Sequence, residues 1–275
     1  MFRADRGPNS NKTLIIEAVT PSLFDLPLRL GDAASLASIL LDLPVTPKPV
    51  TDDLRNRAAA RAASLNFDAM VPVYASLERD PVHPSAYYIC VDGVDGQRLL
   101  LRAAPATSPS SGLFPKAILI GRTFLGRHEA VLNAIPFSPH DGERIRTFSE
   151  QVNRQFLPKP FGSRPVVVVR SEAPHEQFPS VFEAFRRQWK ANGQNMACFG
   201  LSEGQDPESF YLATVWAAIR SGWREGYTLT APGERMPLIP GLKLRPYETG
   251  ISAVREVSLK RELALEDILN ILATE

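Results

Sequence analysis

Residues 166–230 read VVVVRSEAPHEQFPSVFEAFRRQWKANGQNMACFGLSEGQDPESFYLATVWAAIRSGWREGYTLT. Short apolar runs at Val166 to Arg170, Met196 to Leu201 and Tyr227 to Thr230 alternate in this stretch with two longer helical patterns. Apolar runs of strand length that are separated by helices are typical of parallel β-strands, which need a long crossover connection. The stretch therefore predicts consecutive βα units in the second half of the chain.

Each of the two crossover segments has an apolar stripe at helical spacing. The first stripe consists of Val181, Phe182, Phe185 and Trp189. The second helix is expected to begin at Asp206-Pro207, because an acid suits the N-cap and a proline suits the first helical position. One apolar face on each helix indicates that both pack against a sheet.

The tetrapeptide Ser138-Pro139-His140-Asp141 predicts the start of an earlier helix. Ser138 suits the N-cap, Pro139 the first helical position and Asp141 the third, where an acid complements the helix dipole. We therefore expect His140 and Asp141 in the first turn of this helix.

The first half of the chain has a different pattern. Between residues 86 and 137 the apolar runs are close together, joined by Asp92 to Gly96 and by Thr123 to His128. Such short connections join antiparallel strands only. The sequence thus predicts an α/β protein with an antiparallel, hairpin-rich N-terminal half followed by βαβαβαβ parallel units, arranged as an incomplete or distorted barrel or as a mixed open sheet.

The expected organisation has three segments. Residues 1–104 form an N-terminal α/β segment with a β-hairpin, residues 105–116 a loop rich in proline and serine, and residues 117–275 the βα-repeat segment. The two larger segments are expected to pack as one globular unit. A second loop, rich in proline, is expected between Ala231 and Tyr247.

Composition and charge exclude several classes of protein. Lys and Arg number 31 against 30 Asp and Glu, so no basic surplus favours nucleic-acid binding. Cys90 and Cys198 are far apart in sequence and have no second cysteine nearby, which excludes a zinc knuckle and a disulfide framework. No apolar run reaches the roughly 18 residues of a membrane span, and the first residues lack a signal-peptide pattern. We expect a soluble, cytoplasmic protein.

The motifs of the common nucleotide-binding and hydrolase families are absent from the sequence. It contains no GxGxxG, no GxxxxGK[ST] and no GxSxG. The chain therefore has no sequence support for a nucleotide cofactor or for a serine nucleophile elbow.

Polar residues follow each predicted strand, at the end where parallel α/β proteins bind their ligands. They are Ser138, His140 and Asp141 after Ala130 to Ile135; Arg170, Glu172 and His175 after Val166 to Val169; Ser202, Glu203 and Asp206 after Met196 to Leu201; and Glu234 after Tyr227 to Thr230. The sequence places these side chains along one edge.

Three interpretations of this edge stay open. His140, Glu172 and Glu203, with or without Asp141, could hold a divalent metal ion, because imidazole and carboxylate suit Mn²⁺, Mg²⁺ or Zn²⁺. His140 or His175 could instead act with a carboxylate as a general acid or base. Finally, these residues could be a helix first turn and solvated loops without a chemical role.

The leading functional hypothesis is a cytosolic metabolic enzyme of the isomerase, lyase or hydrolase type. It would act on a small polar substrate that is sugar-like, carboxylated or phosphorylated, with or without a divalent metal. The candidate catalytic residues are His140, Glu172 and Glu203, and the candidate substrate-binding residues are Arg170, Asp141, His175 and Ser202.

The alternative is a non-catalytic interaction or assembly subunit. It would dock through apolar residues exposed on the segment Phe156 to Phe161. Both hypotheses are compatible with a homo-oligomer.

Overall fold

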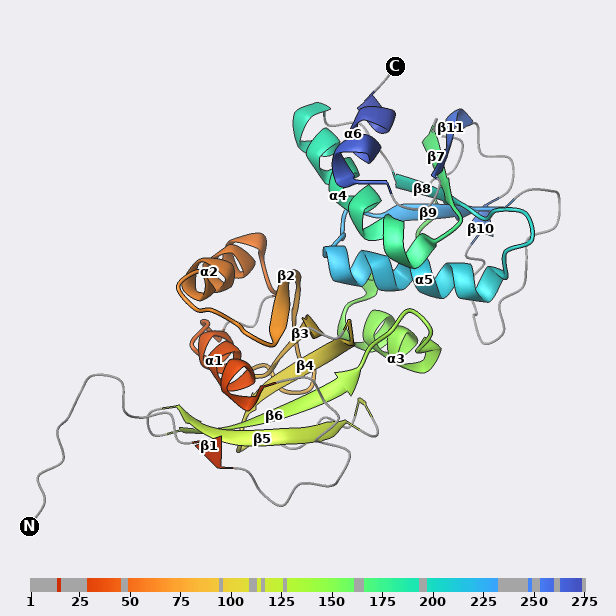
Figure 1. Cartoon of the computed structure of the whole chain (residues 1–275). Helices are drawn as coiled ribbons and strands as arrows, with labels where there is room; N and C mark the ends of the chain where they lie inside the picture. Colours follow the sequence, from red (N-terminus) through yellow and green to blue (C-terminus); the bar gives the residue numbers. More distant parts are fainter. Residues whose placement is uncertain are drawn as a thin grey trace, which may run out of the picture. The chain divides into compact units, whose positions relative to one another are not determined.

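Two β-sheets organise the chain, one in each half (Figure 1). The computed structural model describes residues 14–15, 29–45, 49–93, 96–108, 113–114, 117–125, 128–160, 166–192, 197–231, 247–248, 253–259 and 263–273. Contacts divide the chain into two compact units, Met1–Phe137 and Ser138–Glu275. This break falls later than the boundary that the sequence pattern places at residues 105–116.

The first unit is built on a six-stranded sheet in the order β1-β5-β6-β4-β3-β2. Its strands are β1 (Leu14–Ile15), β2 (Met70–Arg79), β3 (Tyr87–Gly93), β4 (Arg98–Pro105), β5 (Ile118–Leu125) and β6 (His128–Pro136). All neighbouring pairs are antiparallel, which confirms the prediction for this half. Because β5 and β6 pair with each other and β6 with β4, the expected βα-repeat segment starts after β6 and not at residue 117.

One face of this sheet packs against the helices α1 (Leu30–Leu41) and α2 (Asp52–Ala62). Alternate residues of β3 and β4, such as Ile89 and Leu101, point toward this face because side chains alternate along a strand. They meet Leu36 and Leu40 of α1 and Ala58 of α2 in one buried cluster. Thr51 caps α2 by accepting a hydrogen bond from the Leu54 amide at 3.3 Å.

A fully buried ion pair joins the end of β2 to β4. Arg102 Nε donates to Asp80 Oδ2 at 2.8 Å, and both side chains are 0% exposed. The Asp80 carboxylate also accepts hydrogen bonds from the amides of Val82 and His83 and from the Tyr88 hydroxyl, at 2.9 to 3.2 Å. Several donors therefore compensate the cost of burying this charge.

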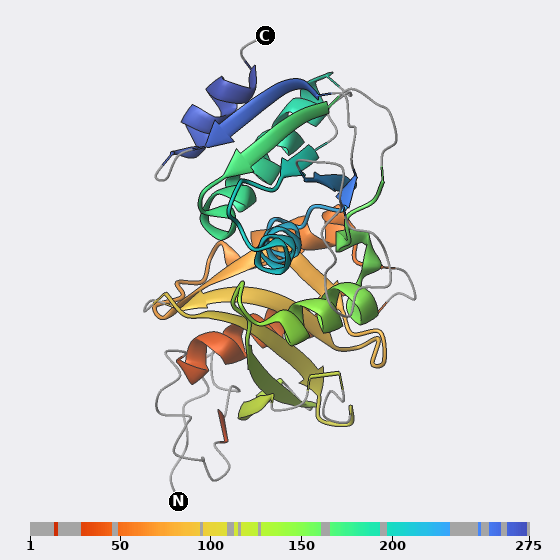
Figure 2. The ribbon, with the colours of Figure 1, turned by 90° about the vertical axis from the view of Figure 1, so that its right-hand side faces the viewer.

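The second unit is built on a parallel five-stranded sheet in the order β10-β9-β8-β7-β11. Its strands are β7 (Val166–Ser171), β8 (Ala197–Gly200), β9 (Tyr227–Thr230), β10 (Tyr247–Glu248) and β11 (Ala253–Leu259). Every neighbouring pair is parallel, which confirms the prediction of parallel βα units. Figure 2 shows β7 and β11 side by side. The chain thus forms two separate sheets and not one barrel or one mixed sheet.

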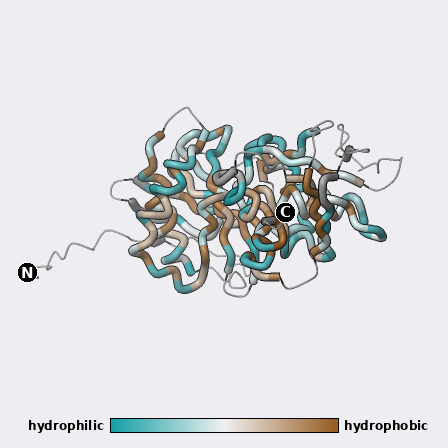
Figure 3. Tube along the Cα trace, turned by 90° about the horizontal axis from the view of Figure 1, so that it is seen from above, coloured by the Kyte–Doolittle hydropathy of each residue, from teal (hydrophilic) through white to brown (hydrophobic). Residues whose placement is uncertain are grey.

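The helices α4 (Pro174–Asn192) and α5 (Pro207–Ser221) connect β7, β8 and β9. Since these strands follow one another in a single direction across the sheet, right-handed crossovers place both helices on the same face. Aromatic rings fill the layer between helices and sheet; Phe199 of β8 contacts Phe178 and Phe182 of α4 at centroid distances of 4.4 and 4.7 Å. The helix α6 (Leu265–Ala273) packs against α4. In Figure 3 brown, apolar stretches alternate with teal, hydrophilic ones along the trace.

The segment before β7 differs from its prediction. The helix α3 (Gly142–Thr147) continues as the π-helix η2 (Phe148–Val152), and the short 3-10 helix η3 (Arg154–Phe156) follows. Phe156, expected on an exposed docking segment, is buried: its ring lies against Phe148 and under the Arg224 guanidinium. The Lys159 amide donates to the Tyr227 carbonyl at 2.7 Å, so this segment is bound to β9. Phe161 lies outside the described residues.

No helix among the described residues is long and apolar enough to cross a membrane.

Candidate functional site

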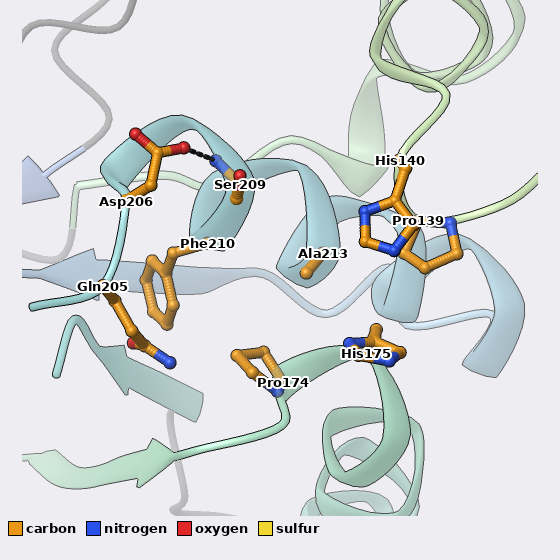
Figure 4. A pocket seen from close by; sticks show the side chains of 9 residues that line it. All are labelled: Pro139, His140, Pro174, His175, Gln205, Asp206, Ser209, Phe210 and Ala213. Carbon is orange, nitrogen blue, oxygen red and sulfur yellow. Dashed lines mark hydrogen bonds between the residues drawn. The ribbon is translucent and has the colours of Figure 1, made fainter.

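A pocket lies in the second unit beside the first turns of α4 and α5 (Figure 4). It is lined by Pro139, His140, Pro174, His175, Gln205, Asp206, Ser209, Phe210 and Ala213. Its volume is about 100 Å³. Since pockets for drug-sized ligands measure about 300–1,000 Å³, this space accepts the reactive end of a small molecule but not a large ligand.

The first turn of α4 is shaped by Ser171, the last residue of β7. Its hydroxyl oxygen accepts a hydrogen bond from the Ala173 amide at 2.9 Å and donates to Gln177 Oε1. Pro174 then occupies the first helical position, where its missing N–H costs nothing. This local order places His175 at the second position of the helix, beside the pocket.

Asp206 begins α5 as the sequence predicts. Its carboxylate accepts a hydrogen bond from the Ser209 amide at 2.8 Å, and Pro207 is the first helical residue. The bond from the Ser209 amide, followed by one from the Ser209 side chain, lowers the pKa of Asp206. The carboxylate is therefore a fixed negative charge at the rim of the pocket.

Gln205 ties the two helix starts together. Its amide oxygen accepts from the Ser202 amide at 2.9 Å, and its amide nitrogen donates to the Ser171 carbonyl at 2.7 Å. One side chain thus connects the loop after β8 to the end of β7.

His140 reaches the pocket from a tight turn. The Asp141 carboxylate accepts from the Ser138 amide at 2.8 Å, and the Ser138 hydroxyl accepts from the His140 amide at 3.3 Å. Because both groups bond within the turn, the helix begins at Gly142 with Asp141 as its N-cap, and not at Pro139 as expected. His140 therefore precedes the helix, and its ring points toward His175 in Figure 4.

Two imidazoles lie side by side in the lining of the pocket. The ring centroids of His140 and His175 are 5.9 Å apart, with an angle of 58° between the ring planes. His140 is exposed, whereas the side chain of His175 is 30% exposed and lies 3.5 Å from Glu176 Oε1. Two proton-transfer groups from separate segments thus face one small space.

The other predicted site residues do not line this pocket. Glu172 and Glu203 are exposed on loops. Asp141 is bonded within its turn and to Arg144 Nη1 at 3.1 Å, and Ser202 contributes a backbone amide to Gln205. Arg170 donates to the Leu201 carbonyl. Glu234 lies outside the described residues.

The carboxyl ends of the parallel strands position only part of this site. His175 follows β7 of the parallel sheet, as expected. His140 follows β6, which belongs to the antiparallel sheet, so the turn 138–141 and not the end of a parallel strand positions it. The sequence analysis did not identify three residues that line the pocket, Gln205, Ser209 and Phe210. The only feature of the sequence that points to Gln205 is its position just before the helix start at Asp206-Pro207.

The expected metal ligands are not gathered in the structure. Within the described ranges, no three His, Cys, Asp or Glu side chains are grouped so that they could hold one metal ion. The neighbour of His140 in the pocket is His175. Glu172 and Glu203, the other two expected ligands, do not line this pocket.

Comparisons with known proteins give only a remote likeness. No protein-family model matches the chain, and no curated protein matches it either. A glycerol complex of fructuronate-tagaturonate epimerase UxaE from Cohnella laeviribosi aligns at 13% identity and a TM-score of 0.44, over 67% of this chain and 33% of that one. The native structure of the same epimerase aligns at 14% identity and a TM-score of 0.43, over 64% and 32%. The chain thus covers about one third of the epimerase chain.

Proposed function

We propose that this protein is an enzyme that binds a small polar metabolite in the His140–His175 pocket and transfers a proton on it. The observation that carries the proposal is the pair of imidazoles, 5.9 Å apart, at the mouth of a cavity beside the ends of parallel strands. Ligands of open α/β sheets bind at this edge.

Histidine suits proton transfer because its charge changes between pH 5 and 8. A neutral imidazole accepts a proton through one ring nitrogen, and a protonated one donates. With one ring in each state, a substrate bound beside the two rings can lose a proton to one ring and gain a proton from the other. Isomerisation and elimination of a hydroxylated metabolite can both use such a pair of groups.

The walls of the pocket support this chemistry. Pro139, Pro174, Phe210 and Ala213 present carbon surface to the cavity. Pro139 and Phe210 are buried, so these walls are rigid and displace water from the reacting end of a ligand. Asp206 and Ser209 also line this space and add polar atoms to its wall.

Proton transfer is tested by deuterium exchange. The protein is incubated in D₂O with a panel of small hydroxy acids, keto acids and sugar phosphates, and exchange at carbon is followed by NMR. We expect one class of compound to exchange, and the variants H140A and H175A to lose at least about 100-fold in rate, which is the usual contribution of a general acid or base.

The matched control is H83A. His83 belongs to the first unit, outside the pocket, and its amide, which the substitution keeps, makes its bond to Asp80. H83A should exchange at the wild-type rate. Equal rates in the wild type and in the double variant H140A/H175A would overturn the proposal.

A further inference from the structure

Gln205 lines the pocket with an amide group that is only partly used. Its Nε2 atom carries two hydrogens, and one of them is donated to the Ser171 carbonyl at 2.7 Å. Its Oε1 atom accepts a hydrogen bond from the Ser202 amide at 2.9 Å. Among the residues that the structure describes, no acceptor is bonded to the second hydrogen of Nε2. One N–H donor of a pocket residue is therefore available to a ligand.

The two partners of this amide set its orientation. The backbone N–H of Ser202 requires an oxygen and the carbonyl of Ser171 requires an N–H, so the two ends of the Gln205 amide cannot be exchanged. Ser171 is itself anchored, because it is buried and its hydroxyl donates to Gln177 Oε1. Figure 4 shows the half-buried Gln205 side chain extending toward Pro174 of the pocket wall. A donor that is already fixed binds a ligand oxygen with little further loss of side-chain freedom.

The other polar side chains of the pocket are committed to other contacts or roles. Neither lysine nor arginine is present among the described residues that line it. The pKa of Asp206 is lowered, so its carboxylate is ionised at neutral pH and only accepts hydrogen bonds. The Ser209 side chain is bonded to this carboxylate, and His140 and His175 are the proton-transfer groups of the proposed function. The amide of Gln205 is thus the neutral donor that is left for an oxygen atom of a ligand.

From this arrangement we infer that Gln205 determines the specificity of the pocket by donating its second amide hydrogen to a carbonyl or hydroxyl oxygen of the substrate. The inference rests on the proposed function and names the class of substrate, a small oxo or hydroxy compound. A fixed donor favours a ligand with the matching oxygen, because an analogue without that oxygen leaves the donor without a partner.

Three acids of equal length test this assignment: pyruvate, lactate and propionate. They share a carboxylate and differ at the second carbon, which is a carbonyl in pyruvate, a hydroxyl-bearing carbon in lactate and a methylene in propionate. Each acid is titrated into the ¹⁵N-labelled protein, and the side-chain amide signals are followed by NMR. We expect pyruvate and lactate each to bind about fivefold more tightly than propionate, which corresponds to one neutral hydrogen bond. One Nε2 hydrogen of Gln205 should shift with both, while the hydrogen that is bonded to Ser171 should not.

Substitutions of Gln205 test the donor directly. Q205M removes the amide but keeps the length of the side chain, so the three acids should bind with equal affinity. Q205E keeps an acceptor for the Ser202 amide but has no N–H, and it should bind pyruvate no more tightly than propionate. The matched control Q151M replaces an exposed glutamine of η2 outside the pocket lining and should keep the preference of the wild type. Circular dichroism shows whether each variant is folded.

Two results would overturn the assignment of Gln205. The first is a wild-type protein that binds propionate as tightly as pyruvate and lactate, or that binds none of the three. The second is a Q205M variant that keeps the preference of the wild type. If Q205M and Q205E do not fold, the response of the second Nε2 hydrogen in the wild type decides the question.

Failure of this inference is distinct from failure of the proposed function. H140A/H175A should keep the preference for pyruvate and lactate while it loses deuterium exchange. If it keeps both, the histidines are not the proton-transfer groups, although Gln205 still binds the oxygen. If the wild type shows no preference but its exchange depends on His140 and His175, the proposed function stands and Gln205 does not recognise the substrate.

Discussion

At the scale of single residues, the buried pair Asp80 and Arg102 has the largest expected effect on stability. Each group lies in a region without solvent, and each compensates the charge of the other at 2.8 Å. Removal of one partner leaves an uncompensated buried charge, which costs far more than the pair contributes. A variant that keeps only one of these two charges is therefore strongly destabilised.

We expect D80N and R102M each to lower the free energy of unfolding by about 3–5 kcal/mol. The double variant D80N/R102M should lose much less than the sum, because no lone charge is left behind. Urea denaturation measures all three. The control D53N breaks the exposed pair of Asp53 and Arg57 and should cost about 0.5 kcal/mol or less. Additive losses in the double variant would contradict this account of the pair.

A residue's role can be recognised in the sequence only when its partner is close in the chain. Asp206 was identifiable as a helix cap because the hydrogen bond of a cap spans only two or three residues of sequence. Asp80 and Arg102 were not identifiable as a pair, because 22 residues separate them. The pairing of β2, β3 and β4 brings them together.

At the scale of elements, the boundaries of α5 show what local sequence predicts well. The helix starts at the expected Asp206-Pro207 and ends at Ser221, with Gly222 in the left-handed conformation at φ 66°. Trp223 lies beyond the helix end, where its indole N–H donates to the Gly226 carbonyl at 2.8 Å. Gly222 and Gly226 both have positive φ, so the sequence alone could not choose which of them ends the helix.

The N-cap of α5 gives a prediction with a defined pH dependence. D206A should lower the free energy of unfolding by about 1 kcal/mol at neutral pH, since the Ser209 amide loses its acceptor. The pKa of Asp206 is lowered in the folded protein, so its contribution is complete above the ordinary carboxyl pKa and is lost as the pH falls through the lower folded value.

The matched variant for this cap is D206N. An asparagine caps nearly as well but carries no charge, so D206N should keep most of the stability and lose the acid-dependent part. Denaturation in urea at neutral and acidic pH separates the two effects. A loss in D206A that does not change between these pH values would show that the carboxylate charge has no role in the cap.

At the scale of the whole molecule, both units bury tyrosine hydroxyls. Burial raises the pKa of Tyr74 in the first unit to about 12 and that of Tyr211 in the second unit to about 12. The pKa of Tyr227, whose hydroxyl donates to the Phe156 carbonyl at 2.9 Å, is raised well above its ordinary value, mainly by burial. Ionisation of these groups therefore opposes folding in both units.

We expect stability to be unaffected below the ordinary tyrosine pKa near 10 and to fall as the pH rises from there through the folded values. Absorbance of tyrosinate and far-UV circular dichroism are followed together through an alkaline titration. The buried tyrosines should ionise only as the secondary structure is lost. Ionisation of all six tyrosines near pH 10 with a native spectrum would contradict their burial.

By itself the sequence determined the strand type of each half and the local start of α5. Hairpin lengths, apolar periodicity and helix caps each depend on residues that are close in sequence. These patterns can therefore be recognised without a structure. Only the tertiary structure decided that the strands form two sheets, that His140 faces His175 and that Gln205 joins the two helix starts. These features depend on hydrogen bonds and packing between residues that are far apart in the chain. The pattern of residues within one segment does not show which distant segment it will pack against.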